Sequence, residues 1–460
     1  MVAAGPRSAL VKKKEMSITE GNLLGNMIKY AIPIILTNLL QIFYNSADMF
    51  VIGNFCEDPN ALGSVGCTGA MINLILGIFI GLGAGVSVTL AQSIGSGDRE
   101  RSEKVVHTSF LLAIVLGVAV GVVGYFVSVP LLELMNTPSE FMAGASKYVK
   151  IYFCGSVANV MYNFCAGILR SRGDTVRPML FSMVGGIINI ILNVIFVVSF
   201  GMGVEGVAIA TIASQFISAA LTVIYMTKLG DECRLCFSKL GIDKDVLVRF
   251  IKVGLPAGIQ GSLFSLSNML LQSGYNSLGP IAVNANTAAS NVDAYIYNIL
   301  NSFYHTTLTF ASQNFGAKKY GRVKKVALLS TVCVTVTGLV LGSLSYIFSD
   351  TLVGLFDSDP QVLELARSRL MLVGIPYFLC GLMEVGTALN RSIGYSLNSL
   401  IITLFGSCAF RVVWIYTVFA MYKYIEVLYL VYPVSWIVTS SVLFGVFFVC
   451  YKKAKRAELI

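Results

Sequence analysis

Four ionisable side chains lie inside long apolar stretches of the sequence. They are Asp48, Asp293, Glu384 and Arg411. Placing such a group in a bilayer costs free energy, so these groups are functional candidates wherever they occur in membrane segments. A carboxyl group in apolar surroundings can carry a proton, and together with amide oxygens it can bind a hard cation such as Na⁺.

Asp48 has amide neighbours on two of the predicted helices. Gln41, Asn45 and Asp48 fall at i, i+4 and i+7, which places them on one helical face. Asn189 and Asn193, four residues apart, share a face of another helix. We predict an ion-coupling site for H⁺ or Na⁺ from these five residues, with Na⁺ held by Asp48, Asn189 and Asn193. The alternative is that Asp48 only hydrogen-bonds within the core.

A second group of polar residues lies mainly in the C-terminal half. The candidates for a substrate site or cleft are Tyr44, Asn268, Gln272, Asn291, Asp293, Glu384 and Arg411. Polar stripes of this kind line a water-filled cavity or join helices, and we favour lining. Asp293 is a candidate for attracting a cation or for carrying a second coupling charge. For Glu384 and Arg411 we favour a structural ion pair over direct contact with substrate.

The composition requires these side chains to be positioned by membrane helices. Charged residues are 12% and hydrophobic residues 56% of the 460 residues, and the mean hydropathy is +0.76. Soluble domains carry about 25% charged residues. Apolar runs of membrane-spanning length occur twelve times, near 28–53, 62–92, 105–130, 143–168, 177–199, 205–227, 249–275, 280–314, 325–348, 366–392, 397–421 and 427–451.

Basic residues alternate between the loops. They crowd the two tails and the loops after the second, fourth, sixth and eighth runs, whereas the loop after the ninth run is acidic. This positive-inside pattern predicts that both termini are cytoplasmic. The net charge of +9 is then a signal of membrane topology and not of nucleic-acid binding.

Short motifs recur at a constant spacing. Pro33 matches Pro256, Gly95 matches Gly316, and Gly173 matches Gly394, at separations of 223, 221 and 221 residues. A parallel repeat follows, with two six-helix lobes around a cleft that opens alternately to the two sides of the membrane.

The predicted domain boundaries follow from this repeat. The chain divides into a cytoplasmic tail at 1–27, an N-lobe at 28–227, a linker at 228–248, a C-lobe at 249–451 and a tail at 452–460. Residues 1–15 are interpreted as an extension outside the fold, since Met16 is a reasonable start. The alternative to transport is a duplicated scaffold.

Other chemistries have little support. The sequence lacks a phosphate-binding GxxxxGK[ST] loop and contains only two histidines, His107 and His305. Cys233 and Cys236 form a lone CxxC without the further ligands a zinc site needs. Gly77, Gly81 and Gly85 are best explained by close helix packing. We therefore expect no enzyme and no cofactor beyond a coupling ion.

Several motifs resemble those of the multidrug and toxic compound extrusion (MATE) family. They are Tyr44–Gly53, the pair Gln92–Gly95 and Gln313–Gly316, and Leu169–Thr175. The resemblance covers about residues 20–452. It implies a V-shaped exporter with two lobes that expels organic cations and other amphipathic drugs in exchange for H⁺ or Na⁺.

The resemblance also assigns residues. Asp48 matches the coupling carboxylate of the family, and Asn189 and Asn193 match its partner positions, although many members have Asp in place of Asn193. Phe264 and Cys380 stand where one branch of the family has acidic residues. The chain is therefore most similar to the bacterial branch that couples through the N-lobe, and Asp293 is a candidate for the missing C-lobe role.

The sequence thus predicts an antiporter for cationic or amphipathic compounds. We expect a monomer in the bacterial inner membrane that does not bind nucleic acid. A flippase for lipid-linked oligosaccharides, from the same wider superfamily, is the main alternative and would need a basic cleft for pyrophosphate. The four intramembrane groups singled out above contain three acids and one arginine, which favours cationic drugs.

Overall fold

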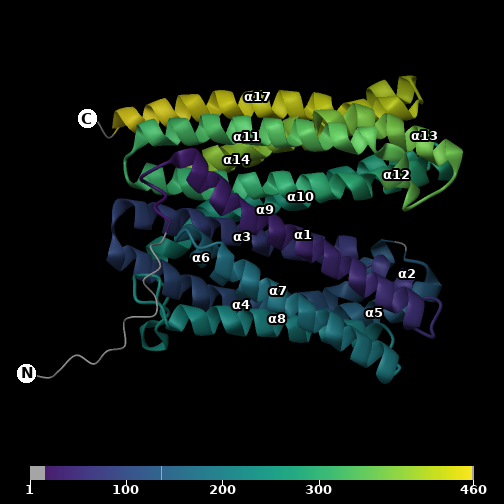
Figure 1. Ribbon diagram of the computed structural model, residues 1–460, viewed down its shortest axis with the longest axis horizontal. Coiled ribbons are helices and arrows are strands. Elements are labelled where there is room, and N and C mark those ends of the chain that lie inside the picture. The colour runs from purple at the N-terminus through teal and green to yellow at the C-terminus, as the bar shows by residue number, and fades with distance from the viewer. Residues whose placement is uncertain (1–15, 136, 458–460) are drawn as a thin grey trace, which may run out of the picture.

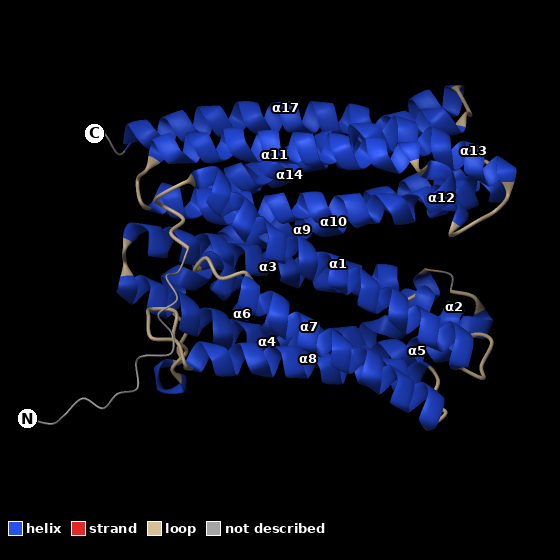
Figure 2. Cartoon of the chain, in the orientation of Figure 1, coloured by secondary structure: helices blue, strands red, loops and turns tan. Residues whose placement is uncertain are grey.

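The chain folds into long helices that run side by side in the computed structural model, whose described residues are 16–135 and 137–457. Figure 2 shows helices and loops, and no strand, over these residues. Ten helices are long and apolar enough to cross a membrane, and the bent pair α5 (Ser139–Cys154) and α6 (Ser156–Ser171) makes eleven. The remaining predicted segment is α10 (Pro280–Gly316), a 37-residue helix rich in Asn, Ser and Thr. The predicted all-helical membrane fold is confirmed.

Each predicted segment corresponds to one helix or to a chain of consecutive helices. The first six are α1 (Leu23–Phe55), α2 with α3 (Ala61–Gly66 and Gly69–Ser96), α4 (Arg99–Leu134), α5 with α6, α7 with the π-helix η1 (Val176–Asn193 and Val194–Ser199), and α8 (Val204–Thr227). Four of the second six are single helices: α9 (Lys244–Asn276), α10, α11 (Tyr320–Ile347) and α17 (Ile425–Ala457). The tenth predicted segment consists of α13 (Pro360–Arg369), η3 (Leu370–Gly374), η4 (Ile375–Tyr377) and α14 (Phe378–Ser392). The eleventh consists of α15 (Ser396–Thr403), η5 (Leu404–Ala409), α16 (Phe410–Trp414) and η6 (Ile415–Phe419). Two short helices, η2 (Phe237–Lys239) and α12 (Ser349–Gly354), lie in connections.

Several apolar runs that look continuous in the sequence are interrupted in the structure. The α5–α6 pair bends by 50° at Gly155, where a Cβ atom would lie 2.5 Å from the side chain of Ile212 on α8. Glycine therefore allows the bend to pack closely against α8. Apolar composition reports burial in lipid but not the local hydrogen-bond register, so the sequence did not predict these breaks.

The helices gather into two halves around a central contact (Figure 1). We call α1–α8 the N-lobe and α9–α17 the C-lobe. Contacts between the lobes are made chiefly by α3 with α9, α3 with α10, and α1 with α10. The described chain begins, just before α1, and ends, with α17, at the same end of the helices, which we call the terminal end (Figure 1).

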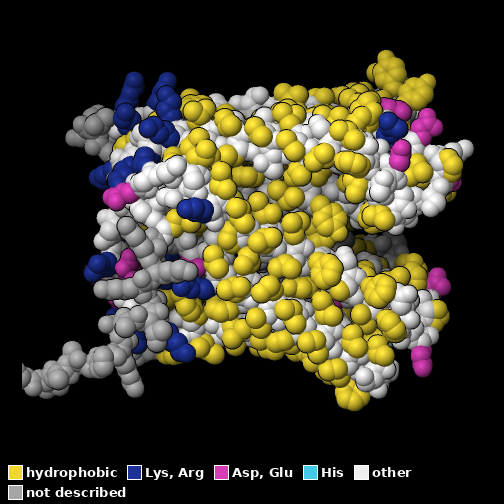
Figure 3. Space-filling model, in the orientation of Figure 1, with side chains coloured by type: hydrophobic (Ala, Val, Ile, Leu, Met, Phe, Trp, Pro, Cys, Tyr) yellow, Lys and Arg dark blue, Asp and Glu magenta, His cyan; other side chains and the backbone are white. Residues whose placement is uncertain are grey.

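The outer surface has the pattern expected of a protein embedded in lipid. Apolar side chains cover the middle of the molecule, while Lys and Arg gather at the terminal end and Asp and Glu are prominent at the opposite end (Figure 3). Exposed apolar residues of this band include Val115, Val118, Val122 and Phe126 on α4, and Leu328, Val332, Val336 and Val340 on α11. An exposed apolar surface of this extent is stable in lipid and unstable in water.

Glycines allow α3 and α9 to cross with their backbones in contact. A Cβ atom on Gly81 would lie 2.2 Å from the backbone nitrogen of Gly258, and one on Gly85 would lie 2.6 Å from the carbonyl oxygen of Phe250. Any larger residue at either position would force the two helices apart. The packing role predicted for Gly81 and Gly85 is confirmed, whereas the nearest atom to a Cβ on Gly77 would be 4.0 Å away.

The repeated motifs meet each other across the lobe boundary. The Gln92 side-chain amide donates a hydrogen bond to the Ser392 carbonyl oxygen at 2.8 Å, and the Gln313 amide donates to the Ser171 carbonyl oxygen at 2.6 Å. Gln92 and Gln313 are repeat equivalents, and so are Ser171 and Ser392, each pair being 221 residues apart. The two bonds therefore form one reciprocal contact, which we call the glutamine latch. It closes the lobes near the terminal end.

The latch predicts a measurable shift between conformations. A buried hydrogen bond contributes about 1 kcal/mol, and about 1.4 kcal/mol is a factor of ten. Removing both bonds in a Gln92→Ala and Gln313→Ala double variant should increase the population with the lobes apart at the terminal end by roughly tenfold to thirtyfold. Spin labels at Glu100→Cys and Lys325→Cys, with the other accessible cysteines replaced, should report it as a longer distance.

A matched control separates the latch from a general loss of glutamine side chains. Gln361 lies at the start of α13, in the other end of the molecule, and is exposed. Gln361→Ala should leave the spin-label distances unchanged. If the double variant also leaves them unchanged, the latch does not hold the lobes together.

The described part of the predicted N-terminal tail is folded against the lobes. Helix α1 begins at Leu23 and is capped by Asn22, so the predicted tail at 1–27 is too long. Ile18 is buried against the C-lobe, and the Ile18 carbonyl oxygen accepts a hydrogen bond from Asn314. The expectation for residues 1–15 lies outside the described residues.

The linker packs on the N-lobe. Leu229, Cys233 and Leu235 are buried in its core, and α9 already begins at Lys244. Burial raises the pKa of the Cys233 thiol. Metal binding and redox chemistry need the thiolate, so this burial disfavours both at the CxxC.

Candidate functional site

Asp48 meets the two predicted asparagines inside the N-lobe. The Asn193 amide donates to Oδ1 of Asp48 and also lies 3.4 Å from Oδ1 of Asn189. Asp48 is 9% exposed, and both asparagines are more deeply buried. Thr211 on α8 also lies beside the carboxylate. Within the described residues, the neighbours of this carboxylate are amides and hydroxyls, with no Lys or Arg among them. We call Asp48, Asn189, Asn193 and Thr211 the N-lobe carboxylate site.

Local packing and backbone geometry fix this site. The Tyr44 ring, one turn before Asp48, occupies the space beside Gly186 of α7, where a Cβ atom would lie 1.9 Å from the ring. The Tyr44 hydroxyl donates to the Met183 carbonyl oxygen at 3.3 Å. Directly after Asn193, α7 changes into the π-helix η1, a rare geometry that is common at functional sites.

The site has the oxygens needed for either candidate ion. Oδ1 of Asn193 is buried and has no hydrogen-bond partner. Together with the Asp48 carboxylate it offers hard oxygen ligands, which suit Na⁺. The Asp48 carboxylate by itself suits a proton. By their chemistry, the oxygens of these two side chains suit either of the predicted ions.

Two predicted members are not part of this cluster. Gln41 and Asn45 are exposed, and Gln41 lines the cleft between the lobes instead. Periodicity predicts that Gln41, Asn45 and Asp48 share one helical face, but α1 lies obliquely between the lobes (Figure 1), so successive turns of the helix meet different neighbours. Asn38, one turn before Gln41, hydrogen-bonds to the Asn298 carbonyl oxygen and to Ser302 of α10.

A cleft of about 820 Å³ lies between the lobes. Figure 3 shows the surface hollowed between the two halves at the end away from the termini. Of the predicted cleft residues, the lining contains Asn268, Gln272, Asp293, Glu384 and Arg411. It does not contain Tyr44, which packs on α7, or Asn291, which is exposed elsewhere.

The C-lobe ion pair differs from the predicted one. Arg369 donates to Asp293 at 2.5 Å, and both side chains are buried. Arg411 does not pair with Glu384 but donates to Ser435 at 3.3 Å and to Asn268 at 3.1 Å. The expected Glu384–Arg411 pair is therefore wrong. Asp293 is already neutralised by Arg369, so it is not the free acidic charge that the sequence suggested.

Three further arginines of the cleft were not predicted from the sequence. Arg170, Arg369 and Arg391 line it beside Arg411, against the acids Asp293 and Glu384. The lining therefore carries a net charge of +2 when both acids are ionised. The predicted acid excess is wrong, because these arginines lie near the ends of apolar runs, where they resemble loop charges. One signal in the sequence could have found Arg369. It lies two residues, about half a helical turn, after Arg367, so only one of these two side chains can face outward while the other faces inward.

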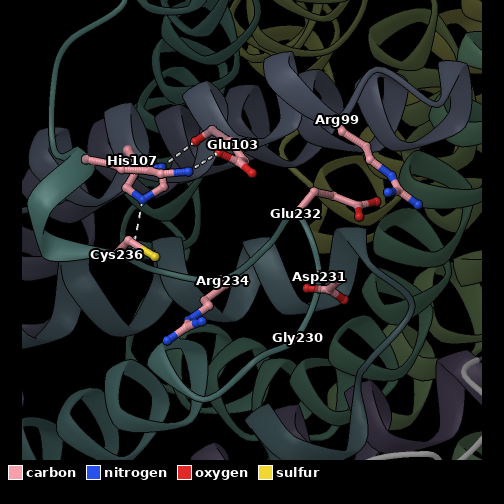
Figure 4. A pocket seen from close by; sticks show the side chains of 9 residues that line it. Arg99, Glu103, His107, Gly230, Asp231, Glu232, Arg234 and Cys236 are labelled. Atoms are coloured by element: carbon pink, nitrogen blue, oxygen red, sulfur yellow. Dashed lines mark hydrogen bonds and ion pairs between the residues drawn. The ribbon is translucent and has the colours of Figure 1, made fainter. Parts of the chain in front are cut away.

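A second, smaller cavity of about 420 Å³ lies at the terminal end, between α4 and the linker. His107 joins its two walls (Figure 4): Nε2 accepts from the Cys236 backbone N–H at 3.1 Å, and Nδ1 lies 2.7 Å from the Glu103 carbonyl oxygen. Arg99, Glu232 and Arg234 surround the cavity with mixed charge (Figure 4). His107 therefore fastens the linker to the N-lobe.

Comparison with known proteins agrees with this geometry. The MatE family model matches the chain twice, at residues 33–195 and 256–417, which are the two repeats. The probable multidrug resistance protein YoeA of Bacillus subtilis is 28% identical over 446 residues, covering 95% of this chain and 96% of that protein. A protein named as an FAD transporter, from Shewanella oneidensis, is 26% identical over 403 residues, covering 85% of this chain and 86% of that protein.

A solved structure gives the same fold. The outward-facing conformation of a multidrug resistance MATE family transporter superposes with a TM-score of 0.89 at 22% identity, covering 96% of this chain and 99% of that chain. These relatives and structural neighbours are transporters and not enzymes. With two family matches that together span most of a multi-pass membrane fold, the chain belongs to the MATE family of multidrug efflux transporters.

Proposed function

We propose that this chain exports amphipathic organic compounds by antiport, in exchange for H⁺ or Na⁺ bound at the N-lobe carboxylate site. The observation that carries the proposal is the buried Asp48 carboxylate, which has amide and hydroxyl neighbours but no cationic partner. A buried carboxylate that lacks a fixed cation is stabilised by binding a mobile one. It can therefore take up an ion from one side of the membrane and release it on the other.

The orientation is part of the same proposal. Lys and Arg gather at the terminal end (Figure 3), which supports cytoplasmic termini in a bacterial plasma membrane. The cleft is hollowed at the opposite end, while the glutamine latch closes the terminal end. This arrangement corresponds to an outward-open state, ready to release a compound and to accept an ion. We propose that a monomer carries out the cycle, because each chain has its own cleft and its own carboxylate site.

The sequence-based preference for cationic substrates rested on an excess of acidic groups. Because the cleft has four arginines against two acids, the proposal keeps an amphipathic substrate but not the requirement for a positive charge. The same arginines favour a second candidate, a flippase for lipid-linked pyrophosphates. The relative named as an FAD transporter is a precedent by name for an anionic cargo in this family.

Transport into proteoliposomes tests the proposal. Purified protein is reconstituted and uptake of an amphipathic probe set is measured with a Na⁺ gradient, a pH gradient or neither. The proposal predicts accumulation above equilibrium with one of the two gradients and none without. Equal uptake under all three conditions would contradict antiport.

A further inference from the structure

We infer that the C-lobe wall of the cleft binds the anionic group of an amphipathic aromatic substrate, with Arg411 as the principal contact. The inference rests on the proposed export function and specifies its substrate class: an aromatic or planar body carrying a sulfonate, phosphate or carboxylate.

Among the described residues, neither Arg411 nor Arg391 forms an ion pair with an acidic side chain, and the Glu384 charge acts on Arg391 only from a greater distance. Arg411 and Arg391 are 3% and 6% exposed. Arg411 donates to Ser435 and Asn268, and Arg391 donates to Tyr304 and Gln260 at 2.6 Å each. Buried arginines in membrane proteins are normally paired with acids. An anionic ligand in the cleft would supply the missing countercharge.

Unused donors point to the same conclusion. Nε of Arg391 is buried and has no hydrogen-bond partner, and the same holds for Nε of Arg369. Guanidinium groups offer several donors in a planar fork that matches sulfonate, phosphate and carboxylate oxygens. Both residues line the cleft, so an anion bound there would lie close to buried guanidinium groups whose hydrogen-bonding capacity the protein does not fully use.

Aromatic rings lie directly against the arginines. The Tyr432 ring is 4.7 Å from Cζ of Arg411 and 5.8 Å from Cζ of Arg369. The Trp436 ring lies 5.7 Å from that of Tyr432 and 5.0 Å from that of Tyr377. All three aromatic residues line the cleft. A ligand held at Arg411 by its anionic end can therefore place an aromatic body on this cluster.

The backbone supports a specialised site here. The π-helix η3 follows Arg369 directly, and the π-helix η5 ends two residues before Arg411. Two arginines of the cleft are thus placed by the same rare geometry that follows Asn193 in the N-lobe.

A probe set that shares a naphthalene body and carries an anionic, a neutral or a cationic group tests the inference. The probes are 1-naphthalenesulfonate, 1-naphthylmethanol and 1-naphthylmethylammonium, and binding to the purified full-length chain is measured by calorimetry. We expect the anion to bind at least about tenfold more tightly than the cation, as expected for hydrogen bonds to an ionised guanidinium. Arg411→Gln should remove most of this preference, and Arg411→Lys should retain part of it. Equal binding of anion and cation to the wild type would overturn the inference.

Arg367 provides the control. It lies on the same helix as Arg369 but is 52% exposed and faces Asp350. Arg367→Gln makes the same change in net charge outside the cleft and should leave the preference intact. Thermal melting of each variant shows whether it is folded. If Arg411→Gln is unstable, Arg391→Gln takes its place. Loss of the preference for the anion over the cation in Arg391→Gln supports the inference, and full retention of that preference overturns it.

Charge movement separates this inference from the proposed function. One-for-one export of a monoanion against an imported monovalent cation moves two positive charges inward, whereas export of a monocation moves none. Membrane voltage should therefore drive ion-coupled transport of 1-naphthalenesulfonate strongly. Ion-coupled transport of 1-naphthylmethylammonium alone would overturn the anion site but leave antiport standing. Uncoupled transport of every probe would contradict antiport instead.

A lipid arm distinguishes the source of the anion. Binding of 1-naphthalenesulfonate is measured in vesicles that contain an isoprenoid pyrophosphate lipid. If this lipid competes with the sulfonate, and if Arg411→Gln weakens the competition, a lipid headgroup is a second ligand of the same site. Absence of competition, with tight sulfonate binding, would assign the site to soluble amphipathic anions.

Discussion

Replacing Asp48 with asparagine should abolish uphill transport while leaving the protein folded. The substitution keeps the shape and the hydrogen-bonding capacity of the side chain, which is buried against Asn193, but removes the ionisable group. One charge moving through 100 mV supplies about 2.3 kcal/mol, which for a neutral cargo sustains roughly a 40–50-fold gradient. In Asp48→Asn proteoliposomes the accumulation ratio should fall to about one, because no ion is coupled to the cargo.

The control for this variant is an acid outside the site. Asp350 lies on α12 and is 70% exposed, so Asp350→Asn should accumulate the probe like the wild type. Full uphill transport by Asp48→Asn would show that the coupling ion binds elsewhere.

The second large effect is expected at the crossing of α3 and α9. A Cβ atom on Gly258 would lie 2.3 Å from the Ile78 carbonyl oxygen and 2.7 Å from its Cα. Because these are backbone atoms, the clash can be relieved only by moving a helix, and overpacking of this kind costs about 1–3 kcal/mol or more. Gly258→Ala should lower the melting temperature, and it should hold α3 and α9 apart.

Gly261 is the matched control, one turn further along α9. Nothing lies within 4 Å of a Cβ atom at this position, so Gly261→Ala should melt like the wild type. The two variants add the same methyl group to the same helix. Equal stability of both would mean that α3 and α9 are not in close contact in the working protein.

The fold was largely predictable because its signals are long. Apolar runs of membrane-spanning length, alternating basic loops and motifs repeated about 221 residues apart each extend over many residues. Local interruptions were not predictable. The bend at Gly155 and the π-helices after Asn193 and Arg369 depend on which helix packs against that turn, and a single sequence does not report this.

Only part of the candidate site could be predicted, because helical spacing is visible in the sequence but long-range packing is not. Asp48, Asn189 and Asn193 came from helical spacing, and the structure brings them together. The polarity of the cleft was predicted wrongly, since Arg369 and Arg391, near the two ends of the predicted run 366–392, were not among the intramembrane groups considered. Their inward orientation follows from the packing of α13 and α14 against α10, a long-range contact.

Exchange of ion and cargo through Asp48 can be tested by reversing the driving force. Proteoliposomes loaded with 1-naphthalenesulfonate and diluted into cargo-free buffer, with no ion gradient imposed, should drive H⁺ or Na⁺ movement against the cargo flux. An internal pH dye and an internal Na⁺ dye record this movement. We expect cargo-driven movement of one of these ions in the wild type and none in Asp48→Asn. Cargo efflux without movement of either ion in the wild type, or equal ion movement in Asp48→Asn, would contradict it.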